Sequence, residues 1–128
     1  MARFRTAAMV AAAAGLLGAV LAAPAYAATG YDRCPTGAYC MFSGLDGGGD
    51  VVVITSNVAD LRTVGIDKAG KSDWNRTGST VWLYSDYDYG GCDAITGAGE
   101  KGNYFSSFQD FFSSVQVGGS GQAESCQV

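Results

Sequence analysis

Histidine is missing from all 128 residues of this sequence. Histidine supplies the general base of most serine and cysteine hydrolases and a common nitrogen ligand of zinc. One pair of carboxylates, Asp86 and Asp88, flanks Tyr87, but aspartates in turns of this kind usually cap backbone amides. We therefore expect a protein that is not an enzyme, with no catalytic residues and, calcium aside, no cofactor.

Long apolar runs are absent except near the N-terminus, where residues 7–23 are almost wholly apolar. Arg3 and Arg5 precede this run, and the small-x-small sequence Ala25-Tyr26-Ala27 follows it. A positive tip, an apolar centre and a small-residue cleavage site are typical of a secretory signal peptide. We predict a signal peptide over 1–27 and a secreted, extracellular protein.

Basic residues are scarce in the remaining chain, which we treat as a single domain over 28–128. Two of the 8 basic residues lie in the signal, which leaves 6 against 12 acidic residues, a balance of 6 − 12 = −6. Acidic surfaces repel nucleic acid and anionic membranes. We therefore expect no binding to nucleic acid or to membrane. We also expect a monomer.

Closely spaced cysteine pairs of the zinc-ribbon kind are also absent, so disulfides are the expected role of the four cysteines in an exported protein. Four cysteines allow three pairings. We favour Cys34–Cys40, because these neighbours would fix an N-terminal turn, and this leaves Cys92–Cys126. The polar, glycine-rich tail over 118–128 is predicted to be flexible and attached only through Cys126.

Glycine is abundant, since 17 of the 19 glycines lie in 28–128. This is about a sixth of those residues, against an ordinary share of about 7%. Together with many aromatic and β-branched residues, this glycine content predicts short strands joined by tight turns. We expect an all-β domain with one modest core.

An internal repeat supports this fold class. Segments 42–49 and 84–91 share four of eight residues at a spacing of 42, and each lies between two strand-like runs. An aromatic ring opens each segment, and a glycine seven residues later can adopt a positive φ. Residues 67–72 and 109–114 repeat at the same spacing, each before another strand-like stretch. We predict two copies of a four-strand unit, over about 37–76 and 79–117.

The remaining aromatic residues are predicted to fill the core. Five of them have near-helical spacing together with Val115 and predict a short helical turn before the last strand: Tyr104, Phe105, Phe108, Phe111 and Phe112. Trp74 and Trp82 are assigned to the core for the same reason.

The second copy resembles the Greek-key signature of βγ-crystallins, with Tyr84, Tyr89 and Gly91 at the signature positions and Ser113-Ser114 as the serine pair. In the first copy, Phe42 and Gly49 fit, Gly47 stands where the second aromatic residue belongs, and Lys71-Ser72 keeps only the second serine. The resemblance implies two Greek-key motifs forming a βγ-crystallin-like sandwich linked by disulfides. It also implies that a serine hydroxyl bonds back to each folded hairpin.

The opening Cys34-Pro-Thr-Gly-Ala-Tyr-Cys40-Met-Phe42 is similar to that of secreted actinobacterial peptidase inhibitors of the Streptomyces metalloproteinase inhibitor type. Residues 74–78 and 81–84 resemble the middle of that family. The resemblance implies an inhibitor whose partner is an extracellular peptidase, in particular a metallopeptidase.

In that family the inhibitory segment is an exposed loop bounded by a disulfide. Here no second cysteine follows Cys92 closely, and the glycine-rich loop over 93–103 is predicted to be flexible. We therefore place the expected inhibitory segment beside the Cys92–Cys126 link, at Cys92, Asp93, Ala94 and Ile95.

The alternative function is a calcium-binding or purely structural extracellular module. Some crystallin-type domains bind calcium through Asn/Asp-Asn/Asp-x-x-Ser/Thr-Ser. In the first copy, Lys68 and Lys71 introduce ammonium groups that should abolish such a site. In the second copy, Asp110 and Ser113 keep oxygen donors, although Gln109 departs from the pattern. Ser113 or Ser114 could instead serve only to hold the hairpin.

Overall fold

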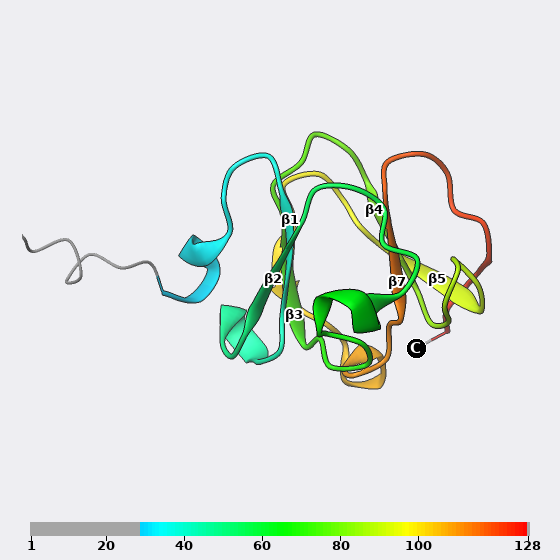
Figure 1. Cartoon of the computed structure of the whole chain (residues 1–128), viewed down its shortest axis with the longest axis horizontal. Helices are drawn as coiled ribbons and strands as arrows, with labels where there is room; N and C mark the ends of the chain where they lie inside the picture. The colour runs from blue at the N-terminus through cyan, green and yellow to red at the C-terminus, as the bar shows by residue number, and fades with distance from the viewer. Residues whose placement is uncertain (1–28, 128) are drawn as a thin grey trace, which may run out of the picture.

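The computed structural model describes residues 29–127, which form two four-stranded β-sheets packed face to face (Figure 1). The first sheet contains, in spatial order, β2 (Val51–Ile54), β1 (Tyr39–Phe42), β3 (Ser72–Asn75) and β6 (Lys101–Asn103). The second contains β7 (Ser114–Val117), β4 (Val81–Tyr84), β5 (Cys92–Thr96) and β8 (Glu124–Ser125). The all-β prediction is confirmed. The predicted signal peptide lies outside the described residues.

Short 3-10 helices precede or connect these strands: η3 (Gly30–Arg33), η4 (Leu45–Gly47), η5 (Leu61–Val64) and η6 (Ser106–Phe108). The last of them is the helical turn expected before the final strand of the second copy. Within residues 29–127, no helix has the length and apolar character needed to cross a lipid bilayer.

Segments of the two predicted copies pair with each other. β1 to β3 belong to the first copy, but the strand beside β3 is β6 from the second copy, with Asp73 opposite Gly102. In return, Val58 of the first copy pairs with Val115 of β7. Each sheet therefore depends on backbone hydrogen bonds from the other copy, so the two copies form one folding unit.

The core lies between the sheets and consists of the inward-facing side chains of alternate strand residues, such as Tyr39, Met41 and Leu83. Phe108 and Phe112 are buried as predicted, but Phe105 is 69% exposed. Trp74 and Trp82 are only half-buried. The reason is strand alternation: Val81 and Leu83 point inward, so Trp82 between them points outward.

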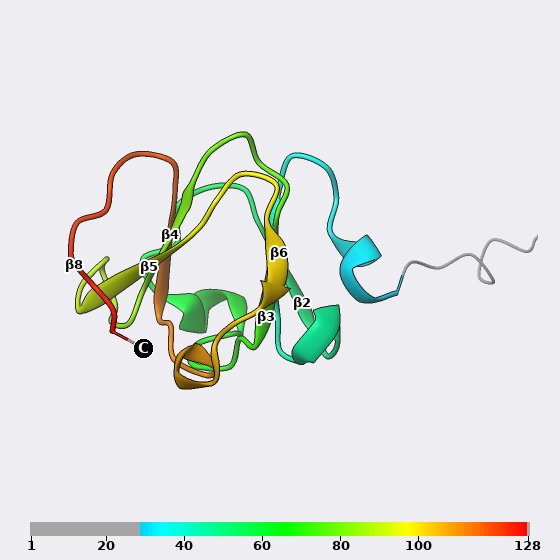
Figure 2. The same cartoon turned by 180° about the vertical axis from the view of Figure 1, so that it is seen from behind.

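The C-terminal segment, which runs past the outer side of β5 in Figure 2, contacts the outward-facing side chain of Trp82. Its Nε1 donates to the Gly119 carbonyl over 3.2 Å, and Gly121 lies so close that a Cβ there would clash with the Trp82 ring. β8 then pairs in parallel with β5. The prediction that Cys126 alone attaches the tail is therefore wrong, because the tail also packs on a tryptophan and extends a sheet.

Two disulfides cross-link the described residues, Cys34–Cys40 and Cys92–Cys126, with Cα atoms 5.7 and 4.8 Å apart. These are the pairs that the sequence favours. The first fixes the turn before β1. The second links the start of β5 to the tail beyond β8.

Candidate functional site

The two folded hairpins repeat the same hydrogen bonds at the spacing of 42 seen in the sequence. The Ser43 hydroxyl accepts the Asp50 N–H over 2.8 Å, and the Ser85 hydroxyl accepts the Cys92 N–H over 2.9 Å. Gly49 and Gly91 have φ values of +68° and +77° and lie against these serines. A side chain at either glycine would meet the serine oxygen.

A second serine in each copy forms hydrogen bonds with the backbone of the folded hairpin. Ser114 Oγ donates to the Asp86 carbonyl over 2.6 Å and accepts the Tyr89 N–H over 3.0 Å. Ser72 Oγ donates to the Gly44 carbonyl and accepts the Gly47 N–H, over 2.7 and 3.0 Å. The hydroxyl of Ser113 is buried without a hydrogen-bond partner in the described chain.

The aromatic residue missing from the first hairpin is replaced from elsewhere in the chain. In the second copy, the rings of Tyr84 and Tyr89 pack edge to face at 5.6 Å. In the first copy, Tyr31 of η3 packs edge to face on Phe42 at 5.3 Å. Gly47 makes room for it, since a Cβ there would be 2.8 Å from the Tyr31 ring. The N-terminal turn thus completes the first hairpin.

Lysine side chains lie at both positions considered for calcium. Lys68 Nζ donates to the Ser85 carbonyl over 2.9 Å and the Phe111 carbonyl over 3.3 Å, which joins the two copies. Lys71 Nζ forms an ion pair with Asp110. Within residues 29–127, no three histidine, cysteine, aspartate or glutamate side chains gather as metal ligands. A bound calcium ion would have to displace an ammonium group.

We therefore expect calcium to leave the protein unchanged. Millimolar calcium should shift the thermal midpoint by less than about 1 °C, because a ligand stabilises only a state that binds it. Differential scanning calorimetry with calcium and with a chelator measures this shift. A clear stabilisation that disappears in Asp110→Ala would restore the calcium alternative.

The expected inhibitory segment is part of a sheet. Cys92 to Ile95 form most of β5, which pairs with β4 along its length and with β8 at its start. The side chain of Asp93 is 4% exposed and accepts the Ala123 N–H. The prediction of a flexible loop over 93–103 is therefore wrong, because strands β5 and β6 occupy most of it. Ile95 does project outward, with 59% of its surface exposed.

The exposed part of this stretch is the turn over 97–100, which carries the chain from one sheet to the other. The Glu100 carboxylate accepts the Gly97 N–H over 2.8 Å. Asn75, buried at the end of β3, donates its N–H to the Glu100 carbonyl and accepts the Gly99 N–H. Its side-chain amide also donates to the Thr96 carbonyl over 2.9 Å. The turn is exposed but held in one conformation by these bonds.

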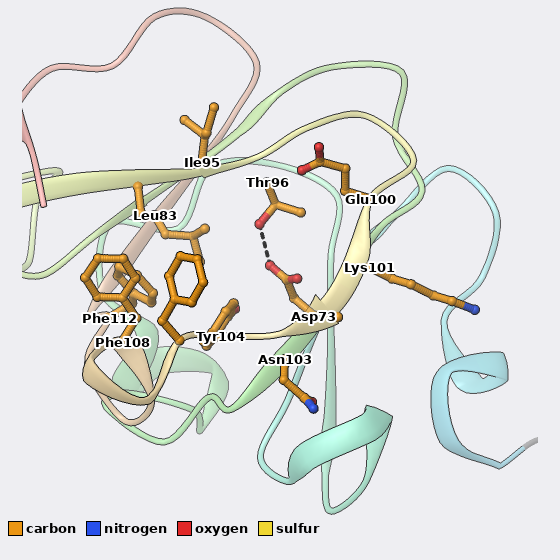
Figure 3. Close-up of a pocket in the computed structure, with 13 residues that line it drawn as sticks. Asp73, Leu83, Ile95, Thr96, Glu100, Lys101, Asn103, Tyr104, Phe108 and Phe112 are labelled. Carbon is orange, nitrogen blue, oxygen red and sulfur yellow. Dashed lines mark hydrogen bonds between the residues drawn. The ribbon is translucent and has the colours of Figure 1, made fainter. Parts of the chain in front are cut away.

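A cavity of about 490 Å³ opens beside this turn, between β5 and β6 (Figure 3). Asp73 of β3 lies on one side of it and a cluster of aromatic rings on the other. Asp73 Oδ2 accepts hydrogen bonds from Thr96 Oγ1 over 2.6 Å and from the Tyr39 hydroxyl over 2.7 Å. Burial raises the pKa of Asp73 from 3.8 to about 6, although these hydrogen bonds act in the opposite direction.

Nothing in the sequence indicated the cavity, the burial of Asp73 or the contacts of Asn75 with the turn over 97–100. Asn75 lies in a segment that resembles the inhibitor family. Its contacts could not be read from that segment, because the turn that it binds belongs to the second copy. No local pattern marks a strand aspartate as buried, because its partners are on separate strands and loops.

The two interlocked hairpin motifs define the βγ-crystallin fold, and known structures agree. A domain solved in work on the evolution of the eye lens βγ-crystallin fold has a TM-score of 0.61 at 20% identity, over 66% of this chain and 88% of that one. A βγ-crystallin from Ciona intestinalis has a TM-score of 0.58 at 21% identity, over 63% and 99%. A βγ-crystallin domain from Clostridium beijerinckii has a TM-score of 0.57 at 20% identity, over 62% and 95%.

The sequence identifies the family to which the chain belongs within this fold. The model of peptidase inhibitor family I36 matches residues 27–96, and the chain belongs to that family. It is therefore an inhibitor-family protein and not an enzyme. No curated protein matches the sequence significantly.

Proposed function

We propose that this protein is a secreted inhibitor of an extracellular peptidase, and that the target is a metallopeptidase. Membership of family I36 is the observation that carries the proposal. Two disulfides suit an oxidising extracellular environment. The metallopeptidase class rests on the resemblance of residues 34–42 to the Streptomyces metalloproteinase inhibitor type.

The peptidase-contacting surface that we propose combines the Ile95 side chain with the turn over 97–100. An inhibitor gains affinity when its contact segment is already ordered, because binding then costs little conformational entropy. The bonds from Asn75 and Glu100 provide that order. An exposed apolar side chain beside a fixed turn can serve as the anchor that fills a pocket of the partner. The proposed contact is therefore narrower than the segment Cys92–Ile95 expected from the sequence at its N-terminal end, and it extends further along the chain into the turn over 97–100.

Inhibition assays test the proposal. The protein in excess should suppress a thermolysin-like metallopeptidase, and Ile95→Ala should weaken inhibition by about ten- to a hundredfold, as loss of a central apolar anchor does. The measurement is residual activity against inhibitor concentration, with serine, cysteine and aspartic peptidases tested in parallel.

Val53→Ala is the matched control. Val53 is an exposed aliphatic residue on the edge strand β2, 47% exposed, and distant in the sheet order from β6 and its turn. It should leave inhibition unchanged. Full activity of all four peptidase classes would contradict the inhibitor proposal and favour a structural module. Equal effects of the two substitutions would retain inhibition but exclude Ile95 as the anchor.

A further inference from the structure

The cavity between β5 and β6 is negatively charged. Asp73 and Glu100 both line it. Lys101 also lines it, but its ammonium group points away and lies 4.5 Å from the centre of the Trp74 ring, on the outer face of the sheet (Figure 3). The charge of Lys101 therefore does not neutralise the carboxylates. An anionic ligand would be repelled, and a cation would be attracted.

Asp73 has one oxygen free to bind such a cation. The side chain is 3% exposed, and Oδ2 already accepts two hydrogen bonds. Oδ1 accepts none from residues 29–127. Because the Tyr39 hydroxyl donates to Asp73 Oδ2, the Tyr104 hydroxyl, 2.8 Å away, can donate to Tyr39, and it also lies near enough to Asp73 to lower the pKa of that carboxyl. With no hydrogen bond of its own from the described residues, Oδ1 retains acceptor capacity.

The opposite wall is apolar. It is formed by Leu83, Phe108 and Phe112, with the ring of Tyr104 between this wall and Asp73 (Figure 3). A volume of about 490 Å³ lies in the range of small-molecule sites, roughly 300–1,000 Å³, and exceeds what one protruding lysine side chain fills. Size therefore favours a free small molecule over a side chain of a protein partner.

We propose that this cavity binds a small organic ammonium ion, with its ammonium group on Asp73 Oδ1 and its aryl or alkyl body against Leu83, Phe108 and Phe112. A buried, ionised carboxylate with spare acceptor capacity is costly, and an ammonium donor compensates that cost. The titratable groups that face Asp73 are Tyr39 of β1 and, at the two ends of β6, Glu100 and Tyr104. None of them provides a positive charge, so the ligand has to provide it.

Titration with phenethylammonium near neutral pH tests this site, followed by isothermal calorimetry and by ¹H–¹⁵N NMR shifts. We expect saturable binding with shifts around Asp73, Thr96 and Phe112. The neutral analogue 2-phenylethanol should bind at least about tenfold more weakly, because a charged hydrogen bond contributes more than a neutral one. Asp73→Asn should cause a similar loss.

Two further variants make the outcome decisive even if Asp73→Asn disturbs the fold. Ala94→Leu fills the cavity from β5 with Asp73 intact and should abolish binding. Asp50→Asn removes the same charge from an exposed site and should leave binding unchanged. The proposal is overturned if the unaltered protein shows no saturable binding, if 2-phenylethanol binds equally well, or if Ala94→Leu binds like the unaltered protein.

Discussion

Replacing Gly91 with alanine is expected to lower the thermal midpoint by about 10–20 °C. Gly91 has a φ of +77°, which costs an alanine about 1–2 kcal/mol. Its Cβ would also overlap with Ser85 Oγ and would displace that hydroxyl from the Cys92 N–H. Loss of this hydrogen bond adds about 1 kcal/mol. The total, about 2–3 kcal/mol, is a large share of the stability of a domain this size.

Gly99→Ala separates the cost of the positive φ from the cost of the contact with Ser85. Gly99 has a similar φ of +83°, but no atom lies within 4 Å of the position of its Cβ. It should therefore lose only the conformational part, and its thermal midpoint should fall by about half as much. Thermal unfolding followed by circular dichroism measures both variants. Equal losses would show that close contact with Ser85 does not matter.

The hairpins were predictable because most of the residues that shape them lie within one repeated segment. The serine, the aromatic ring and the glycine recur at fixed spacings, so a local pattern carries the local fold. Tyr31 shows the limit of prediction from a local sequence pattern. It completes the first hairpin from outside the repeat, and nothing in the spacing around Gly47 indicates which distant ring fills that space.

The turn and the tail were mispredicted for a related reason. Glycine-rich composition predicts flexibility only where no distant group binds the backbone. Here Asn75 of the first copy fixes the turn over 97–100, and Trp82 provides a surface for the tail. Both interactions join residues more than 20 positions apart, so they depend on the assembled sheets and have no local signature.

Asp73 is the clearest example of a property that arises only on folding, and it should make stability depend on pH in an unusual direction. Its pKa is raised by burial to about 6, so the folded protein binds the proton more tightly than the unfolded chain, where the value is 3.8. The stabilisation is fully present below about pH 4 and is lost as the pH rises through about 6. Its size is about 3 kcal/mol, the free-energy equivalent of this pKa difference.

Urea unfolding of the unaltered protein and Asp73→Asn, at about pH 4 and about pH 7.5, measures this effect. Asparagine stays neutral, so the free energy of unfolding of the unaltered protein minus that of the variant should fall by up to about 3 kcal/mol as the pH rises. Other carboxylates titrate in both proteins and cancel in the difference. Asp50→Asn, on the exposed surface, should show no such trend. A difference that stays constant or grows with pH would mean that Asp73 is ionised at no cost, which would remove the electrostatic reason for a cation in the cavity.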